Sequence, residues 1–255
     1  MYQFFVEDEQ IGADVISITG ADVNHIRNVL RMKPGEQVRI SNQRGRDFLC
    51  SVAALSEQEI LLNIEERDIK NTELASKIYL FQGIPKGERM ETVIEKAVEL
   101  GVYEIIPVAM KYCVVKLDEK KAQKKVARWQ EIARSAAKQS KRSLIPQIHP
   151  VMNFREAAAY AMQCDRCLVP YENEAGMAAA KRAFEHLSDA GSISVFIGPE
   201  GGFAGEEIEA LRGQSQVLSL GARILRTDTA AITMLSLLMM KLEQEQEQAD
   251  AQAKE

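Results

Sequence analysis

The segment Gly198-Pro-Glu-Gly-Gly202 follows an apolar run, Ile193-Ser-Val-Phe-Ile197, that is typical of a buried strand. Three glycines in five positions permit positive φ angles and let another molecule approach the backbone closely. A helix is expected directly afterwards, at 204–212, with Glu206 and Glu207 in its first turn. Carboxylates there suit the helix dipole but disfavour a phosphate, so a neutral or cationic ligand fits better. A purely structural turn is the alternative.

A second segment, Leu220-Gly-Ala-Arg-Ile-Leu-Arg-Thr227, ends the next apolar strand. Gly221 interrupts that strand, and Thr227 or Asp228 is a suitable cap for the long apolar helix that follows. Arg223 and Arg226 lie between them, at a position where core packing does not explain an arginine. Guanidinium groups in such a loop are suited to pair with a carboxylate or a phosphate.

Around these segments, apolar runs alternate with helical patterns. The expected strands are 78–81, 104–108, 166–170, 193–198 and 216–220, and the expected helices are 88–100, 119–141, 153–162, 174–187, 204–212 and 228–243. This alternation predicts an α/β domain with a mostly parallel sheet covered on both faces. Ligands of such sheets bind beyond the carboxyl ends of the strands, where a third unusual loop, Leu168-Val-Pro-Tyr-Glu172, joins the other two.

The first part of the chain follows a different pattern. Short apolar runs separated by turn signals predict strands at 4–6, 15–18, 37–41, 47–52 and 59–64, with one helix at about 22–30. Such short strands are typical of a small barrel-like module. We therefore expect one domain at 1–72 and a second at 73–243, joined by a polar linker. Residues 244–255 lose the apolar period and are expected to form a frayed or disordered polar tail.

The composition is that of an ordinary globular protein, with 46% hydrophobic and 27% charged residues. The first residues lack the basic start and apolar core of a signal peptide, and no apolar run reaches the ~18 residues that span a bilayer. We therefore expect a cytoplasmic protein with no membrane partner. Cys164 and Cys167 have C-x-x-C spacing, but Cys50 and Cys113 stand alone. Reduced thiols are favoured over a redox or zinc role, and no metal is expected.

Charge is unevenly distributed along the chain. The formal net charge of −5 argues weakly against nucleic-acid binding, yet residues 107–146 carry eleven Lys and Arg and only three acidic residues. This stretch forms either a solvated helix face or a surface that follows the phosphates of a nucleic acid.

The two glycine-containing segments, about 20 residues apart, together resemble the bacterial 16S ribosomal RNA uracil-N3 methyltransferases of the SPOUT superfamily. Further stretches resemble the same family and lie in the expected order over about residues 2–243: His25–Arg31 with Gly35, Gly83–Arg89, Lys96–Gly101 and Ala136–Arg142 before Pro146. One position departs from the family, which commonly has an arginine where Tyr112 stands. Lys111 is able to supply that charge, so the contribution of residue 112 is left open.

The resemblance implies a PUA-like RNA-binding domain followed by a SPOUT-type α/β domain with a C-terminal trefoil knot. It also implies that the three loops form the knot and hold S-adenosyl-L-methionine (SAM), that the substrate is 16S rRNA of the small ribosomal subunit, and that the chain is a homodimer whose sites are completed by the partner subunit. Other SPOUT enzymes methylate ribose hydroxyls or transfer RNA bases. A non-catalytic RNA-binding or assembly protein and a nucleotide-phosphate enzyme are further alternatives.

Methylation of uracil N3 requires removal of an imide proton and stabilisation of the base anion. Our hypothesis assigns charge stabilisation to Arg223 or Arg226 and proton handling to Glu200, with Glu172 as a second carboxylate. Glu200 is alternatively a structural residue that holds its loop by accepting backbone hydrogen bonds. The last helix is apolar on most sides, so one face covers the sheet and the other needs a partner.

The remaining expected contacts fall into two groups. Those to SAM are Leu168, Pro170, Glu172, Gly198, Pro199, Gly201, Gly202, Leu218, Leu220, Gly221, Ile224, Leu225 and Thr229. Those to RNA are His25, Arg27, Arg31, Lys86, Arg89, Arg134, Lys138, Gln139 and Arg142. Within the second group, Arg134, Lys138 and Arg142 are spaced by four residues and are expected to share a helix face.

Overall fold

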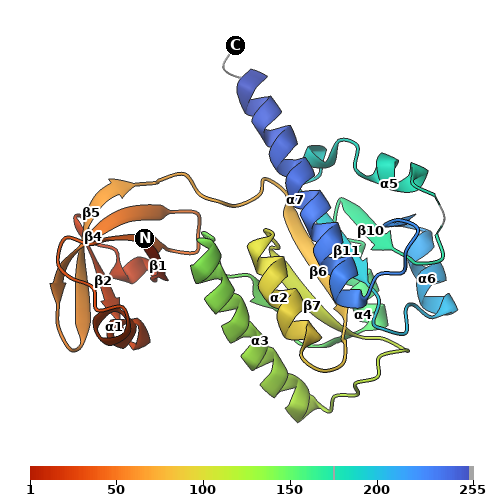
Figure 1. Ribbon diagram of the computed structural model, residues 1–255, viewed down its shortest axis with the longest axis horizontal. Coiled ribbons are helices and arrows are strands. Elements are labelled where there is room, and N and C mark those ends of the chain that lie inside the picture. Colours follow the sequence, from red (N-terminus) through yellow and green to blue (C-terminus); the bar gives the residue numbers. More distant parts are fainter. Residues whose placement is uncertain (175, 253–255) are drawn as a thin grey trace. The chain divides into compact units, whose positions relative to one another are not determined.

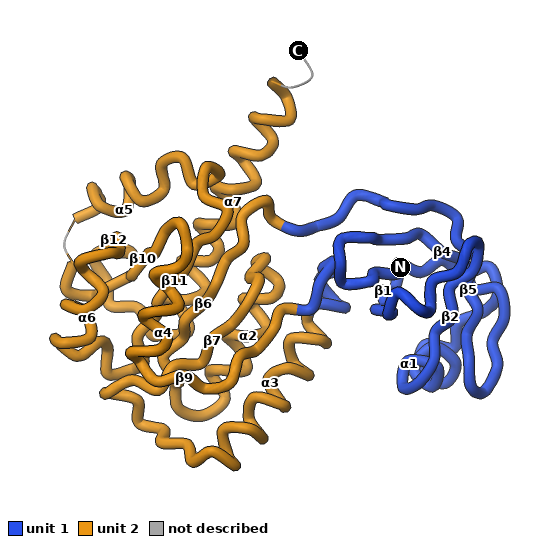
Figure 2. The backbone as a smooth tube through the Cα atoms, turned by 180° about the vertical axis from the view of Figure 1, so that it is seen from behind, with its two compact units in different colours: residues 1–73, 137–145 blue, residues 74–136, 146–255 orange. Residues whose placement is uncertain are grey.

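The structure, a computed structural model, describes residues 1–174 and 176–252. The chain divides into two compact units, which Figure 2 shows in different colours. Unit 1 comprises residues 1–73 and 137–145, and unit 2 comprises residues 74–136 and 146–255. The return of 137–145 to unit 1 is not apparent from the sequence pattern, which places the whole of that stretch in the second domain.

Unit 1 is built on a five-stranded sheet in the order β1-β3-β4-β5-β2. The strands are β1 (Tyr2–Phe5), β2 (Val15–Thr19), β3 (Gln37–Ser41), β4 (Asp47–Leu55) and β5 (Glu59–Arg67). β1 pairs with β3 in parallel, and the other neighbours are antiparallel. Alternate side chains such as Ile16, Ile40 and Phe48 form one apolar core, as the period of a strand requires.

The helix expected at 22–30 is present but changes its pitch. A short turn of 3₁₀ helix (Asp8–Gln10) precedes β2, and α1 (Ala21–Asn24) follows it. A wider π-helical turn then covers His25–Val29, where Leu30 N donates to His25 O at 2.9 Å. Arg31 ends this segment in the left-handed region at φ 53°.

A buried polar network joins residues 137–145 to the sheet of unit 1. Asp47 is fully buried and accepts hydrogen bonds from Arg39 Nη2 at 2.6 Å and from Ser143 Oγ at 2.5 Å. Ser41 Oγ donates to Ser143 O at 2.6 Å. These bonds satisfy polar groups that would otherwise be costly to bury, so they hold the segment in place.

Unit 2 contains a parallel sheet in the order β12-β10-β11-β6-β7-β8, with β9 also paired to β7. The strands are β6 (Lys77–Gly83), β7 (Glu104–Ala109), β8 (Gln147–Ile148), β9 (Met152–Asn153), β10 (Arg166–Pro170), β11 (Ser192–Ile197) and β12 (Gln216–Leu218). Each pairing is parallel, as the alternation of strands and helices predicts. The short strands β8 and β9 were not expected.

Helices cover both faces of this sheet. They are α2 (Arg89–Glu99), α3 (Glu119–Ser140), α4 (Phe154–Ala161), α5 (Ala178–Ala183), a 3₁₀ turn at Leu187–Asp189, α6 (Gly205–Arg212) and α7 (Thr227–Gln252). α2 packs against α7 on one face, and α4 lies on the other (Figures 1 and 2). Phe81 and Phe196 stack at 5.4 Å inside the layers. Of the helices described, none is long and apolar enough to cross a membrane.

Two segments differ from expectation. The helix expected at 174–187 shortens to α5, followed by the separate turn, and residue 175 lies outside the described residues. The frayed or disordered tail expected from residue 244 is wrong as far as residue 252, because α7 continues to Gln252. Glu245 explains part of this extension, since it accepts from Ser188 N at 2.8 Å and pairs with Lys241 at 3.0 Å. Residues 253–255 are outside the described residues.

Candidate active site

A cavity of about 510 Å³ opens beyond the carboxyl ends of β10, β11 and β12. Its walls are three loops at 170–172, 197–203 and 219–227, with Lys86, Arg89 and Ala230 completing the lining. This is the edge at which parallel sheets bind ligands. The sequence argument therefore identified the three loops that the fold brings together.

Hydrogen bonds tie the glycine-rich loop to the start of α7. Thr227 Oγ1 donates to Gly198 O at 2.7 Å and accepts from Gln82 Nε2 at 2.9 Å. Within the loop, Gly202 N donates to Pro199 O at 2.9 Å. The loop is thus fixed at its first residue and closed on itself, which makes it a formed wall of the cavity.

The glycines of this loop are required by close approaches. Gly202 has φ 69°, and a β-carbon there would collide with the carboxylate of Glu172. A β-carbon on Gly201 would lie 2.7 Å from the β-carbon of Tyr112. Both positions exclude a side chain, so the loop presents backbone to the cavity.

Glu200 is bound to the loop that precedes α2. Its Oε1 atom accepts from Lys86 N at 3.1 Å and from Arg89 Nη1 at 2.6 Å. Burial opposes ionisation of this carboxyl, but the backbone N–H groups of Glu200 and Lys86 and the Arg89 guanidinium outweigh it and lower its pKa. A carboxylate stabilised in this way is a weak base. These contacts favour the structural alternative for Glu200 over proton handling.

The loop 219–227 presents its polar groups to solvent. The side chains of Arg223 and Arg226 are exposed, and neither forms an ion pair with any described residue. Ile224 between them is 86% exposed. Two cations beside the cavity that are not neutralised by the protein are available to an anionic partner.

Most of the residues expected to contact a cofactor line the cavity. They are Pro170, Glu172, Gly198, Pro199, Gly201, Gly202, Leu220, Gly221, Ile224 and Leu225. Three do not. Leu168 and Leu218 are fully buried in their strands, and Thr229 is exposed on α7 outside the lining.

Several lining residues were missed as site residues. Tyr171 and Phe203 lie edge to face at 6.1 Å, and the other missed residues of the wall are Ile197, Ser219, Ala222, Thr227 and Ala230. Each of these residues is adjacent in sequence to a predicted site residue. Their positions in or beside the three loops were therefore the signal that could have identified them.

The residues expected to bind RNA divide into accessible and inaccessible groups. His25, Arg31, Lys86, Arg134 and Gln139 are exposed, and Arg27 and Arg89 are partly exposed. Arg142 is not available, because its side chain is 3% exposed and its Nε and Nη2 atoms bind the Glu73 carboxylate at 2.9 and 2.5 Å.

The expected helix face of Arg134, Lys138 and Arg142 holds for Arg134 and Lys138, which both lie in α3, but is wrong for Arg142. α3 ends at Ser140, and Lys141 adopts φ 59°, so Arg142 leaves the helical register. Lys138 is engaged within unit 1, since Nζ binds both carboxylate oxygens of Asp22 at 2.7 and 2.9 Å. Of the residues expected to bind RNA, Arg134 and Gln139 remain exposed at this end of the helix.

Comparison with known proteins places the chain in a family. The RNA methyltransferase domain model matches residues 72–239, and the RNA methyltransferase PUA domain model matches residues 18–65. Ribosomal RNA small subunit methyltransferase E from Bacillus subtilis (strain 168) is 38% identical over 92% of this chain and 95% of its own length. The protein of the same name from Mesomycoplasma hyopneumoniae (strain 232) is 33% identical over 92% and 98%.

A crystal structure is similar over nearly the same length. It is that of ribosomal RNA small subunit methyltransferase E from Neisseria gonorrhoeae bound to S-adenosyl methionine, with 30% identity, a TM-score of 0.81, and coverage of 94% of this chain and 97% of that one. The match spans both units, and the three-loop cavity lies inside the matched methyltransferase domain. This chain therefore belongs to the RNA methyltransferase family and carries that family's PUA domain.

Proposed function

We propose that this protein transfers a methyl group from SAM to N3 of a specific uridine in the 16S rRNA of the small ribosomal subunit. The observation that carries the proposal is the glycine-walled cavity at the carboxyl ends of β10, β11 and β12. Relatives at 33–38% identity are named for the small ribosomal subunit, and the Neisseria structure was solved with SAM bound.

The cavity fits the proposed methyl donor. Its volume of about 510 Å³ falls within the range of sites for ligands of this size. Backbone rather than side chain faces the cavity at Gly198, Gly201 and Gly202, which suits recognition by main-chain N–H and C=O groups. Pro170, Leu220, Ile224 and Leu225 supply apolar surface for an adenine ring. The bound donor would supply a methyl group on a positively charged sulfur.

The protein's own residues then act on the base. Arg223 and Arg226, exposed at the cavity, stabilise the negative charge that appears on uracil when N3 loses its proton. Glu172 is the better candidate for accepting that proton. Its carboxylate lines the cavity and forms no ion pair with a described residue, whereas Glu200 is held by Arg89 and Lys86. Glu200 fixes the glycine-rich loop.

RNA is proposed to bind through accessible basic side chains of each unit. In unit 1 these are His25, Arg27 and Arg31, and in unit 2 they include Lys86, Arg89 and Arg134. Gln139 is available as a neutral hydrogen-bonding group. Such contacts to phosphates give affinity without sequence preference, so selection of one uridine must come from the cavity and its rim.

The chain is proposed to form a homodimer through α7. Ala231, Met234, Leu235 and Leu238 are buried on one side of the helix, while Leu237 and Met240 are 43% and 65% exposed. An apolar helix with one covered side requires a partner for the other. A sedimentation measurement that finds monomers at micromolar concentration would contradict this arrangement.

The loops after β11 and β12 are proposed to form the trefoil knot of the SPOUT fold. They bound the same cavity, although β10 lies between their strands in the sheet. Knotted chains are rare because connections normally do not thread loops. An experimental structure that traces residues 166–230 without threading would remove this part of the proposal.

The decisive experiment is methyl transfer from isotopically labelled SAM to small ribosomal subunits and to free 16S rRNA, each prepared from cells that lack the gene. Digestion to nucleosides and mass mapping should find N3-methyluridine at one position. A label on a ribose 2′-hydroxyl, or on a transfer RNA base, would assign a different SPOUT reaction. Donor binding without transfer to any of these RNAs would support a non-catalytic assembly protein.

A further inference from the structure

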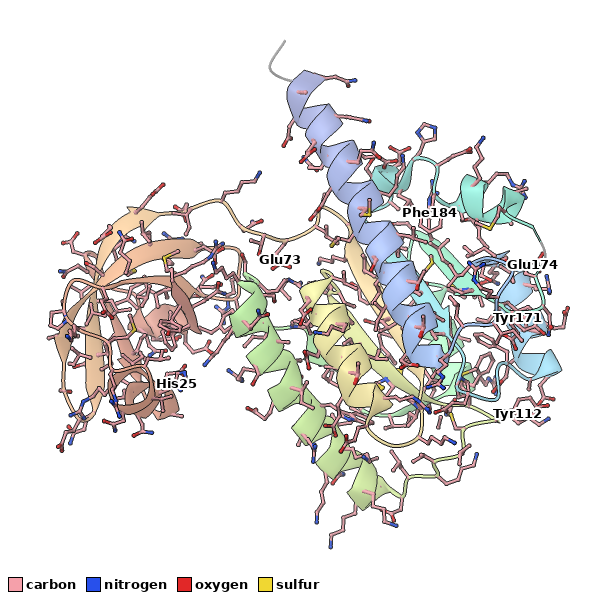
Figure 3. All side chains as sticks on the ribbon, in the orientation of Figure 1. His25, Glu73, Tyr112, Tyr171, Glu174 and Phe184 are labelled. Carbon is pink, nitrogen blue, oxygen red and sulfur yellow. The ribbon has the colours of Figure 1, made fainter. Side chains whose placement is uncertain are left out.

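An exposed tyrosine is in contact with the glycine-rich wall of the cavity. Tyr112 lies in the loop that follows β7, and its β-carbon is at the contact distance that excludes any side chain from Gly201. Its side chain is 47% exposed, and Figure 3 shows it at the periphery of unit 2. Among the described aromatic residues of unit 2 it is the one classed as exposed.

The position of Tyr112 is fixed by a buried carboxylate. Glu207, which is 4% exposed, accepts from Lys111 N at 2.9 Å through Oε1 and from Ala204 N at 2.8 Å through Oε2. One side chain thus bridges the residue before Tyr112 and the end of the glycine-rich loop. Cys113 Sγ accepts from Met110 N at 3.3 Å and closes the turn on the other side. An exposed aromatic residue on a doubly anchored loop is pre-organised for binding.

The ring of Tyr112 is half exposed and has no aromatic neighbour among the described residues. No described aromatic or cationic side chain stacks on it, whereas Tyr171 contacts both Phe203 and Arg212. Core packing does not account for an aromatic side chain that is half exposed and anchored against Gly201, a residue of the cavity wall. Four cations, at Lys86, Arg89, Arg223 and Arg226, line that cavity. A planar apolar ring beside clustered cations complements a nucleobase attached to a phosphate backbone.

The proposed reaction creates a need for such a surface. N3 is on the Watson–Crick edge of uracil, so the base must be unpaired and withdrawn from its neighbours before it can react. The stacking that it loses has to be replaced by the enzyme. We propose, resting on the proposed function, that Tyr112 is the substrate-positioning residue on which a base of the target RNA stacks, beside the cavity wall at Gly201.

Binding of a labelled uridine decamer and of an abasic decamer with the same number of phosphates tests the stacking directly. The wild type should bind the uridine decamer more tightly, and Tyr112→Ala should lose this preference by about five- to one-hundred-fold, the range that base–aromatic stacking produces. Tyr112→Phe should keep it, because the ring remains. Tyr2→Ala, at a tyrosine of similar exposure (51%) in unit 1, is the matched control and should keep it too.

Equal loss of affinity for both decamers in Tyr112→Ala would overturn the proposal. So would loss of the preference in Tyr2→Ala. SAM affinity, measured by calorimetry, should stay within about twofold in Tyr112→Ala; a parallel loss there would assign Tyr112 to support of the Gly201 wall instead. The decamer assay measures binding and does not depend on methyl transfer. Failure of transfer to ribosomal subunits would therefore contradict the proposed function, whereas the role of Tyr112 in stacking is decided by the decamer assay alone.

With small subunits as substrate, the same variants separate positioning from chemistry. Tyr112→Ala should lower kcat/KM for the subunit by a factor similar to its loss of base preference, with rescue by Tyr112→Phe. An unchanged kcat/KM for the subunit in Tyr112→Ala would show that the base finds its position without this ring.

Discussion

Glu200 and Arg89 form an ion pair of 2.6 Å that joins the glycine-rich loop to the first residue of α2. Their side chains are 23% and 29% exposed, so the pair is partly screened by solvent. Because Lys86 N binds the same oxygen, the carboxylate is engaged by two donors from one segment. The relationship explains why a glutamate is suited to a loop whose other residues carry little side chain.

Glu200→Gln should weaken SAM binding and spare the chemical step. The amide keeps an acceptor for Lys86 N but loses the charge that attracts Arg89, which is worth about 1 kcal/mol, or roughly fivefold in Kd, at a partly exposed site. Calorimetry should show this loss, while the single-turnover rate at saturating SAM stays within about twofold. Glu209→Gln on the exposed side of α6 is the control and should change neither. An unchanged Kd with a large loss of rate would return the proton role to Glu200.

Gly202→Ala should abolish most SAM binding. Gly202 combines φ 69° with the close approach of the Glu172 carboxylate, so a methyl group there is strained and displaces a side chain that lines the cavity. The matched variant is Gly213→Ala at the end of α6, where the added β-carbon meets no atom within 4 Å and φ is −66°. Calorimetry with SAM checks both, and equal affinities would show that the loop adapts freely to a side chain.

Arg142→Ala should destabilise the protein without a specific effect on RNA binding. Its guanidinium forms a buried, two-pronged pair with Glu73, and removal leaves that carboxylate uncompensated at a cost of about 3 kcal/mol. Arg134→Ala, at an exposed side chain, should change the free energy of unfolding by less than about 0.5 kcal/mol but reduce the salt dependence of RNA binding. Urea denaturation and binding measured across salt concentrations distinguish the two. A reduced salt dependence in a fully folded Arg142→Ala would contradict the structure.

The sequence is informative about this site because three glycines cluster after one apolar strand, and two arginines that core packing does not explain follow another. The loops 198–202 and 220–227 stand out for that reason, and most residues named from them line the cavity. The parallel sheet follows from apolar runs that alternate with helices, and all its pairings are parallel. Local patterns of this kind are set by the backbone and burial of neighbouring residues, so one sequence is enough to read them.

Contacts between residues far apart in the chain could not be predicted from the sequence. A spacing of four residues places Arg142 on the face of Lys138 only if the helix continues, and the left-handed residue Lys141 breaks that register. Glu73, the ion-pair partner of Arg142, is 69 residues away in the chain. The continuation of α7 beyond residue 243 is likewise supported by a distant residue, Ser188, whose backbone N–H donates a hydrogen bond to the Glu245 carboxylate. No local period encodes contacts of this kind.

Acid should remove a contribution to stability that comes from Glu104. This carboxylate accepts from Tyr160 Oη at 2.8 Å and binds His149 Nε2 at 2.7 Å. Burial alone would raise its pKa, but the His149 and Tyr160 bonds outweigh burial and lower the pKa below its ordinary 4.5. A lowered native pKa means that the unfolded chain takes up the proton first as the pH falls, so the contribution is complete above about 4.5 and is lost as the pH passes through the native value.

Glu104→Gln tests this by removing the titrating group while keeping an acceptor for Tyr160. The variant should be less stable than the wild type near pH 7, and the difference in the free energy of unfolding should shrink below pH 4.5 as wild-type Glu104 is protonated. Urea denaturation at a series of pH values measures both curves. Glu57→Gln, at an exposed glutamate in the turn between β4 and β5, controls for the general loss of one carboxylate. Parallel curves for the wild type and Glu104→Gln down to acid pH would mean that Glu104 has the same pKa in the folded and unfolded chains, and the His149–Glu104–Tyr160 contacts would then contribute no pH-dependent stability.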